Sequence, residues 1–168
     1  MHIVPRPFWF VVPTVIVADQ FTKALVERLI PLNGPPIVVA PGVLVLSHVQ
    51  NPGVAFGQLS GGGPLLIAIA LAAALALTLF RVRRLRRGEH MPTILEFALA
   101  LPMGGALGNL IDRFRQGKVT DFFDLGWFPV FNVADCAITV GGVLLAIYFL
   151  FLEQPPRVQA QVATETPD

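Results

Sequence analysis

Four long apolar segments limit what this sequence can fold into. They run over residues 7–29, 64–80, 93–111 and 131–152. Each approaches or exceeds the length of about 20 residues that an α-helix needs to cross a bilayer. Charged residues make up only 14% of the 168 residues, whereas they make up about 25% of soluble domains. We therefore predict an all-α membrane protein with four transmembrane helices.

The chain is short enough to form one domain. We place a single membrane-embedded domain over residues 1–153 and a flexible C-terminal tail over residues 154–168, because the tail is polar and contains prolines. The first apolar segment begins like a signal sequence. It lacks a small-x-small cleavage motif and continues into charged residues, so we interpret it as a retained helix.

Arginines predict how the helices are oriented in the membrane. The stretch RVRRLRRG (81–88) places five arginines between the second and third segments, whereas residues 30–63 contain no lysine or arginine. Positively charged loops stay on the cytoplasmic side. We therefore expect both termini and the arginine loop in the cytoplasm, and residues 30–63 and 112–130 on the outer side.

The long connection over residues 30–63 is more than a linker. Its stretch IVVAPGVLVLSHVQ is rich in β-branched residues and is bounded by Pro35-Pro36 and by Asn51-Pro52-Gly53. This pattern is typical of two short strands joined by a turn. We predict a small β-sheet at the membrane surface.

Polar residues gather at the outer ends of three predicted helices. They are Asp19, Lys23, Asn109, Arg113, Asn132 and Asp135. Within each helix the two residues lie three or four positions apart and share a face, so Asp19 and Lys23 can pair. An aspartate at the centre of a membrane helix costs about 2.5–3.5 kcal/mol on insertion scales. A buried Asp135 therefore needs a donor, a cation or a second carboxylate nearby.

Asp121 is the candidate second carboxylate, in the connection between the third and fourth helices. The third helix contains Gly104-x-x-x-Gly108, a small-residue face that lets helices approach closely. We expect this face to bring the third helix against the fourth, and so Asp121 towards Asp135. Two carboxylates in a desolvated site titrate separately, one ionised and one neutral. That arrangement suits an aspartic protease, in which the ionised member activates water and the neutral member hydrogen-bonds the scissile carbonyl.

Other interpretations stay open at this point. Polar residues near helix ends can reach interfacial water without any catalytic role, and we interpret Asp112 and Asp124 as solvated or structural. A proton- or ion-coupled transporter could use Asp19, Asp112 and Asp135 as a relay. That function predicts carboxylates spread over the membrane depth, but the inner half of the bundle offers only Glu96. A non-catalytic assembly subunit would leave the two aspartates unexplained.

Composition argues against several other kinds of site. A single cysteine excludes an intrachain disulfide, and the three histidines lie far apart in the sequence. No spacing of cysteine and histidine suggests zinc, so we expect no metal and no cofactor. The net charge is +1, and the charged residues are clustered in a few stretches of the sequence rather than spread along it. This distribution gives no indication of nucleic-acid binding.

Five motifs together resemble the lipoprotein signal peptidases, also called signal peptidase II. They are DQFTK (19–23), NPGVAFG (51–57), GGALGNLIDRF (104–114), GKVTDFFD (117–124) and FNVADCAITVG (131–141), in the family's order. The resemblance implies a four-helix intramembrane aspartyl protease with a small extramembrane β-cradle that matches residues 30–63. It also implies a multi-pass protein of the bacterial inner membrane, with its active site towards the periplasm.

The resemblance implies substrates and partners as well. Family members remove the signal peptide from bacterial prolipoproteins, cleaving just before a cysteine that already carries diacylglycerol. The implied partners are lipid-modified prolipoproteins and membrane lipids, and the enzyme is expected to work as a monomer without a cofactor.

The resemblance assigns Asp121 and Asp135 as the catalytic dyad. The matched positions expected to bind substrate or to support the dyad are Asn51, Gly53, Asn109, Arg113, Asn132, Asp19 and Lys23. The chain departs from the commoner family residues at Pro52, Val54, Thr120 and Cys136. None of these departures is a dyad carboxylate.

Overall fold

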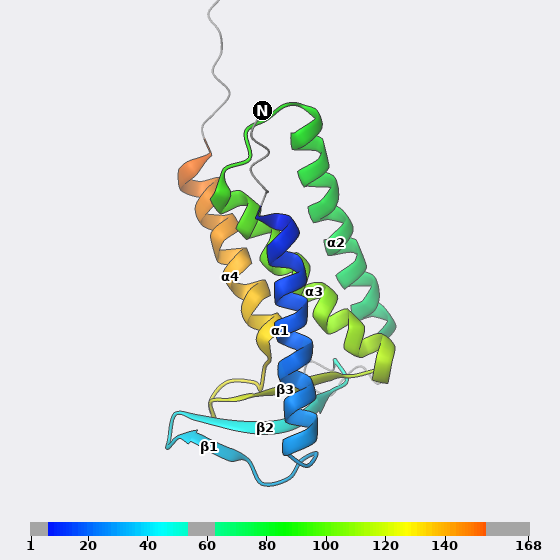
Figure 1. Cartoon of the computed structure of the whole chain (residues 1–168), viewed down its shortest axis with the longest axis vertical. Coiled ribbons are helices and arrows are strands. Elements are labelled where there is room, and N and C mark those ends of the chain that lie inside the picture. Colours follow the sequence, from blue (N-terminus) through cyan, green and yellow to red (C-terminus); the bar gives the residue numbers. More distant parts are fainter. Residues whose placement is uncertain (1–6, 54–62, 154–168) are drawn as a thin grey trace, which may run out of the picture.

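A computed structural model describes residues 7–53 and 63–153 of the chain. The helices in this part are α1 (Phe8–Leu29), α2 (Gly63–Arg86), α3 (Thr93–Gln116) and α4 (Val133–Ile147), and α4 continues into the π-helical turn η2 (Tyr148–Leu152). Four spans of these helices are long and apolar enough to cross a membrane. The helices run along the long axis of the molecule, and a small sheet lies across one end (Figure 1). The predicted fold class is confirmed.

Helix α3 is the centre of the bundle. About 61% of its most apolar window is buried inside the protein, compared with 6% for α2. Helices α1, α2 and α4 all pack against α3. The exposed side chains of α2 before its arginine run are mostly apolar and include Leu65, Ile69, Leu71, Leu75 and Leu79, as expected for a helix that faces lipid rather than water.

Glycines on α3 allow its neighbours to approach closely. A Cβ atom added at Gly104 or Gly108 would come within 2.7 or 2.6 Å of side chains on α1. A Cβ atom at Gly105 would overlap the carbonyl oxygen of Ala134 on α4. The prediction that the Gly104/Gly108 face packs against the fourth helix is therefore wrong. Successive helix residues point about 100° apart, so Gly105, on another face, makes the contact with α4.

The sheet has three antiparallel strands in the order β1 (Ile37–Ala40), β2 (Leu44–Asn51) and β3 (Val119–Asp124). The two strands predicted within residues 30–63 are confirmed as β1 and β2. Strand β3 arises from a segment that we expected to be a loop. Its pairing register places Asp121 opposite Val49 and places Val119 opposite Asn51, at the end of β2.

Several helix ends differ from the predicted ones. Helix α2 continues through the arginine run to Arg86, because arginine favours helices and its long side chain can reach water from a membrane helix. Helix α3 continues to Gln116 and ends at Gly117, whose φ of 74° is left-handed.

The division into a domain over 1–153 and a tail stays a prediction, because the tail lies outside the described residues.

Candidate active site

Asn132 connects the two aspartates of the expected dyad. It is the N-cap of α4, where its side-chain oxygen accepts a hydrogen bond from the Asp135 backbone N–H at 3.0 Å. Asp135 Oδ2 accepts from the Asn132 backbone N–H at 3.2 Å, which completes a reciprocal capping box. The Asn132 Nδ2 group also donates to Asp121 Oδ1 at 2.6 Å. One residue therefore holds both carboxylates in place.

Each carboxylate also accepts a hydrogen bond from a second asparagine. Asn51, at the end of β2, donates through Nδ2 to Asp121 Oδ2 at 3.0 Å. Asn109, on α3, donates through Nδ2 to Asp135 Oδ1 at 2.8 Å. All four carboxylate oxygens are thus hydrogen-bonded, by donors from β2, α3 and the start of α4.

Burial changes the acidity of Asp121, which is only 2% exposed. Desolvation raises the pKa of this carboxyl group from 3.8 to about 6, and the negative charge of Asp135 adds to the rise. Hydrogen bonds from Asn51 and Asn132 and the positive charge of Lys23 act in the opposite direction. A carboxyl group with a pKa near neutrality is suited to general acid–base catalysis.

A fully buried lysine lies beside the two aspartates. The Nζ atom of Lys23 is 2.8 Å from Asp19 Oδ2, 2.9 Å from Asp112 Oδ2 and 2.9 Å from Asn109 Oδ1. These three acceptors match the three N–H donors of an ammonium group. The predicted pair of Asp19 and Lys23 is confirmed, and the structure adds Asp112 to it. We call these four residues the Lys23 cluster.

The Lys23 cluster also holds the backbone next to each aspartate. Asp19 Oδ1 accepts from the N–H of Ala134, the residue before Asp135, at 3.0 Å. Asp112 Oδ2 accepts from the N–H of Thr120, the residue before Asp121, at 3.2 Å. The two carboxylates of the cluster therefore anchor the start of α4 and strand β3.

Gln20 and Asp112 belong to this hydrogen-bond network, although the sequence did not lead us to select them as site residues. The Nε2 group of Gln20 donates to Asp112 Oδ1 at 3.0 Å and to Asp19 Oδ2 at 3.2 Å. Asp112 was interpreted as solvated or structural, and it is structural, with none of its surface exposed. A usable signal was its position three residues after Asn109, which places both on one face of α3.

The remaining predicted residues lie around the same site. Arg113 is half-buried, donates to the Asn109 carbonyl at 3.3 Å and interacts electrostatically with Asp135 and Asp121. Gly53 has a φ of 82°, and its N–H donates to Asn51 Oδ1 at 2.8 Å. That bond fixes the Asn51 amide with its NH₂ group towards Asp121. Among the four positions that depart from the commoner family residues, Val54 lies outside the described residues.

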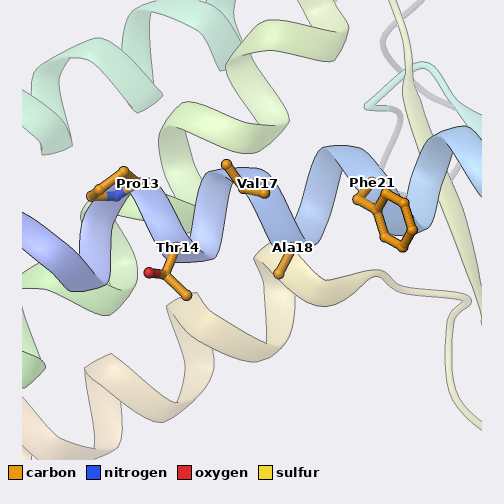
Figure 2. A pocket seen from close by; sticks show the side chains of 5 residues that line it. All are labelled: Pro13, Thr14, Val17, Ala18 and Phe21. Atoms are coloured by element: carbon orange, nitrogen blue, oxygen red, sulfur yellow. The ribbon is translucent and has the colours of Figure 1, made fainter.

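Other candidate sites in the described part of the chain are weaker. No group of three or more His, Cys, Asp or Glu side chains in residues 7–53 and 63–153 could hold a metal ion. A cavity of about 390 Å³ lies along α1 (Figure 2). It is lined by Pro13, Thr14, Val17, Ala18 and Phe21. None of these side chains ionises, so this cavity offers no acid–base chemistry.

Four helices that are long and apolar enough to span a membrane enclose a cluster of buried polar residues, which is the architecture of a membrane-embedded protein. The structure is similar to two solved bacterial membrane enzymes. One has a TM-score of 0.80 and 29% identity, covering 89% of this chain and 96% of that one. The other has a TM-score of 0.78 and 30% identity, covering 88% and 89%.

The model of the family described as signal peptidase (SPase) II matches residues 11–151, and the chain belongs to this family. It is 40% identical over 143 residues to a lipoprotein signal peptidase of Symbiobacterium thermophilum, covering 83% of this chain and 91% of the relative. It is 42% identical over 155 residues to that of Desulforapulum autotrophicum, covering 86% and 92%. The chain is therefore a protease of lipoprotein processing, and these comparisons give no support to a transporter.

Proposed function

We propose that the protein removes the signal peptide from diacylglyceryl-modified prolipoproteins, cleaving the peptide bond N-terminal to the lipidated cysteine, with Asp121 and Asp135 as its catalytic dyad. The observation that carries this proposal is the double contact of Asn132, which hydrogen-bonds both carboxylates. The family's motifs and the buried state of Asp121 support the same assignment.

In the proposed mechanism Asp135 is ionised and takes a proton from a water molecule, whose oxygen attacks the scissile carbonyl carbon. The raised pKa of Asp121, about 6, supports Asp121 as the neutral member that donates to the carbonyl oxygen. Collapse of the tetrahedral intermediate breaks the C–N bond, and a dyad proton passes to the leaving amine of the lipidated cysteine. Because neutral Asp121 is required, kcat/KM is expected to decrease as the pH rises through its pKa.

The other predicted residues support the dyad in this proposal. Asn51, Asn109 and Asn132 orient the carboxylates, and Gly53 orients Asn51. Arg113 supplies positive charge where the carbonyl oxygen becomes negative. Asp19 and Lys23 act through the backbone that they and their partners hold.

The substrate would reach the dyad from the bilayer. The sheet lies at the end of the bundle opposite the arginine-rich turn between α2 and α3 (Figure 1). If that turn is cytoplasmic, the dyad lies towards the periplasm. The acyl chains of the lipidated cysteine would stay in the membrane and hold the scissile bond at the depth of the dyad. We propose that the protein works as a monomer in the inner membrane.

The test is cleavage of a diacylglyceryl-prolipoprotein by purified protein in detergent micelles. We expect Asp121→Asn and Asp135→Asn to lower turnover by about 10²–10⁴-fold or more. Asp124→Asn is the matched control, because Asp124 also lies on β3 but hydrogen-bonds Ser47 and Gly126. It should cleave like the wild type, and the unlipidated precursor should stay uncut. Normal turnover by either dyad variant would overturn the proposed catalytic pair.

A further inference from the structure

Thr120 has more hydrogen bonds than its place in a short strand requires. It has no exposed surface and directly precedes Asp121. Its N–H donates to Asp112 Oδ2 at 3.2 Å, and its carbonyl lies 3.4 Å from Asn132 Nδ2. Its hydroxyl donates to Glu27 Oε1 at 2.8 Å and accepts from Gln116 Nε2 at 2.9 Å. The polar atoms of this one residue contact α1, α3 and the N-cap of α4.

The partners of the hydroxyl continue to the protein surface. Glu27 Oε1 also accepts from the Arg115 guanidinium at 2.6 Å, and this pair is partly exposed, at 26% and 45% of the two side chains. Thr120 therefore lies between the buried Lys23 cluster on one side and a partly exposed ion pair on the other. The two sets of contacts act on the same residue of β3.

Strand β3 needs such contacts because it is the last strand of the sheet. Its outward backbone groups have no further strand to pair with, and a buried N–H without a partner is costly. Asp112 satisfies the Thr120 N–H, and the Phe131 carbonyl accepts from the N–H groups of Phe122 and Phe123. Strand β2 pairs with β3 on one side, and on the other side, side chains and a loop, rather than a further strand, hold β3 in position.

Simple packing does not account for the hydroxyl. A valine side chain is β-branched like threonine and needs no hydrogen-bond partners, so filling this buried space does not by itself require a hydroxyl. A buried hydroxyl needs only one partner to avoid a desolvation penalty. Here the hydroxyl has two charged or amide partners from two helices, in addition to two backbone contacts, so its effect is to fix β3 against α1 and α3.

We propose that Thr120 is a positioning residue that couples the Glu27–Arg115 ion pair to Asp121 and holds that carboxylate at Asn51 and Asn132. This inference rests on the proposed dyad. Weakening the hydrogen bonds of the Thr120 hydroxyl would let β3 shift, and the bonds that Asn51 and Asn132 donate to Asp121 would lengthen. Misplacement of a catalytic group by a fraction of an ångström is enough to slow the reaction severalfold.

The test compares Thr120→Val with Thr120→Ser in the full-length protein. We expect Thr120→Val to lower kcat by about 5- to 20-fold with KM unchanged, and Thr120→Ser to restore most of it, because serine keeps the hydroxyl. The alkaline limb of the kcat/KM profile should move to higher pH in Thr120→Val, since weaker bonds to the Asp121 carboxylate favour its neutral form. The charged groups that act on Asp121 are Asp135, Lys23 and Arg113, and the variant retains all three.

The position of the limb separates positioning from folding, because it does not depend on how much enzyme is active. Glu27→Ala removes the acceptor of the hydroxyl at a partly exposed site and should move the limb in the same direction if Thr120→Val fails to fold. Thr78→Val is the matched control, because the Thr78 hydroxyl bonds only within its own helix, to Ala74, in the described contacts.

Two results would overturn the inference. An unchanged limb with unchanged kcat in Thr120→Val shows that the hydroxyl has no role in positioning Asp121. A lower rate with an unchanged limb shows a structural role only. Either result, obtained while Asp121→Asn is inactive, removes this inference and leaves the proposed function intact. An active Asp121→Asn variant would instead remove the proposed dyad itself.

Discussion

The Lys23 cluster near the sheet and the Arg81–Glu96 pair at the opposite end of the bundle both bury charge between helices. Lys23 has no exposed surface, and Arg81 and Glu96 are 5% and 1% exposed. Lys23 contacts Asp19, Asp112 and Asn109, and the two aspartates in turn accept from backbone N–H groups. The acceptors around Lys23 thus extend the cluster to β3 and to the start of α4.

The charge of Arg81 interacts with an acidic side chain and an aromatic ring on two neighbouring helices. Its guanidinium lies 3.2 Å from Glu96 on α3 and stacks over the Phe8 ring of α1, 4.3 Å from the ring centre. These contacts connect α2 to α3 and α1 at the end of the molecule away from the proposed dyad. A buried ion pair can thus fix helices to one another, as that of Arg81 does, or fix the backbone beside the proposed dyad, as that of Lys23 does. The difference lies in what the carboxylate partners contact.

The largest effect is expected from Lys23→Met. Removing the ammonium leaves the carboxylates of Asp19 and Asp112 buried without their cation, which should lower the free energy of unfolding by about 3–5 kcal/mol. Activity should be lost as well, because Asp19 and Asp112, which anchor the backbone beside both residues of the proposed dyad, lose the cation that holds them in place. Thermal unfolding in detergent and cleavage of a lipidated precursor measure the two effects. Lys118→Met, at an exposed position before β3, is the control. Wild-type turnover by Lys23→Met would show that the Lys23 cluster does not position the proposed dyad.

Arg81→Met should be destabilising but catalytically silent. It leaves Glu96 without the Arg81 cation in a buried position, at a cost of about 3 kcal/mol. The kcat of the protein that remains folded should equal that of the wild type, since none of the contacts of Arg81 within residues 7–53 and 63–153 reaches the proposed dyad. Unfolding temperature and active-site-normalised turnover test this expectation. A severalfold loss of kcat in the folded fraction would show that the two ends are coupled.

The stability of Asp121→Asn relative to the wild type should depend on pH. The folded-state pKa of Asp121 is raised from 3.8 to about 6, so the folded protein binds more protons than the unfolded chain between these values. The wild type should therefore lose stability relative to the variant as the pH rises from 4 to 7, by up to about 3 kcal/mol. Unfolding temperatures of both proteins across this range give the difference. A difference that stays constant with pH would contradict the raised pKa.

The smallest effect is expected from Asn51→Ala. The Asn51 hydrogen bond lowers the pKa of Asp121, so its removal should raise that pKa above about 6. The alkaline limb of the kcat/KM profile should move upward by about one pH unit. Ser47→Ala, also on β2 but bonded to Asp124, should leave the limb unchanged. A limb that moves to lower pH in Asn51→Ala would show that another group sets it.

Local patterns in the sequence predicted much of the bundle. The lengths of the apolar segments located all four helices, and the i, i+4 spacing of Asp19 and Lys23 predicted their ion pair. The β-branched residues before Asn51 predicted β1 and β2. These features depend on neighbours within a few residues, which is why the sequence shows them directly.

Other features depended on distant partners and were missed. Strand β3 forms by pairing with β2, about 70 residues earlier in the chain, and its short sequence gave no sign of it. Gln20 and Glu27 lie on α1 but bond to residues near 110 and 120. The glycines of α3 were recognised as a close-packing face, but the sequence did not show which helix each glycine faces.

Length, hydropathy and ordered motifs are properties of the chain alone, and they were enough to predict four membrane-spanning helices, a small surface sheet and membership of a peptidase family. The packed structure was needed to show that Asn132 bridges Asp121 and Asp135, and that the Lys23 cluster holds the backbone beside each of them. Those contacts join residues from several different elements. A hydrogen bond requires its donor and acceptor within about 3 Å, and only the packed bundle fixes such distances.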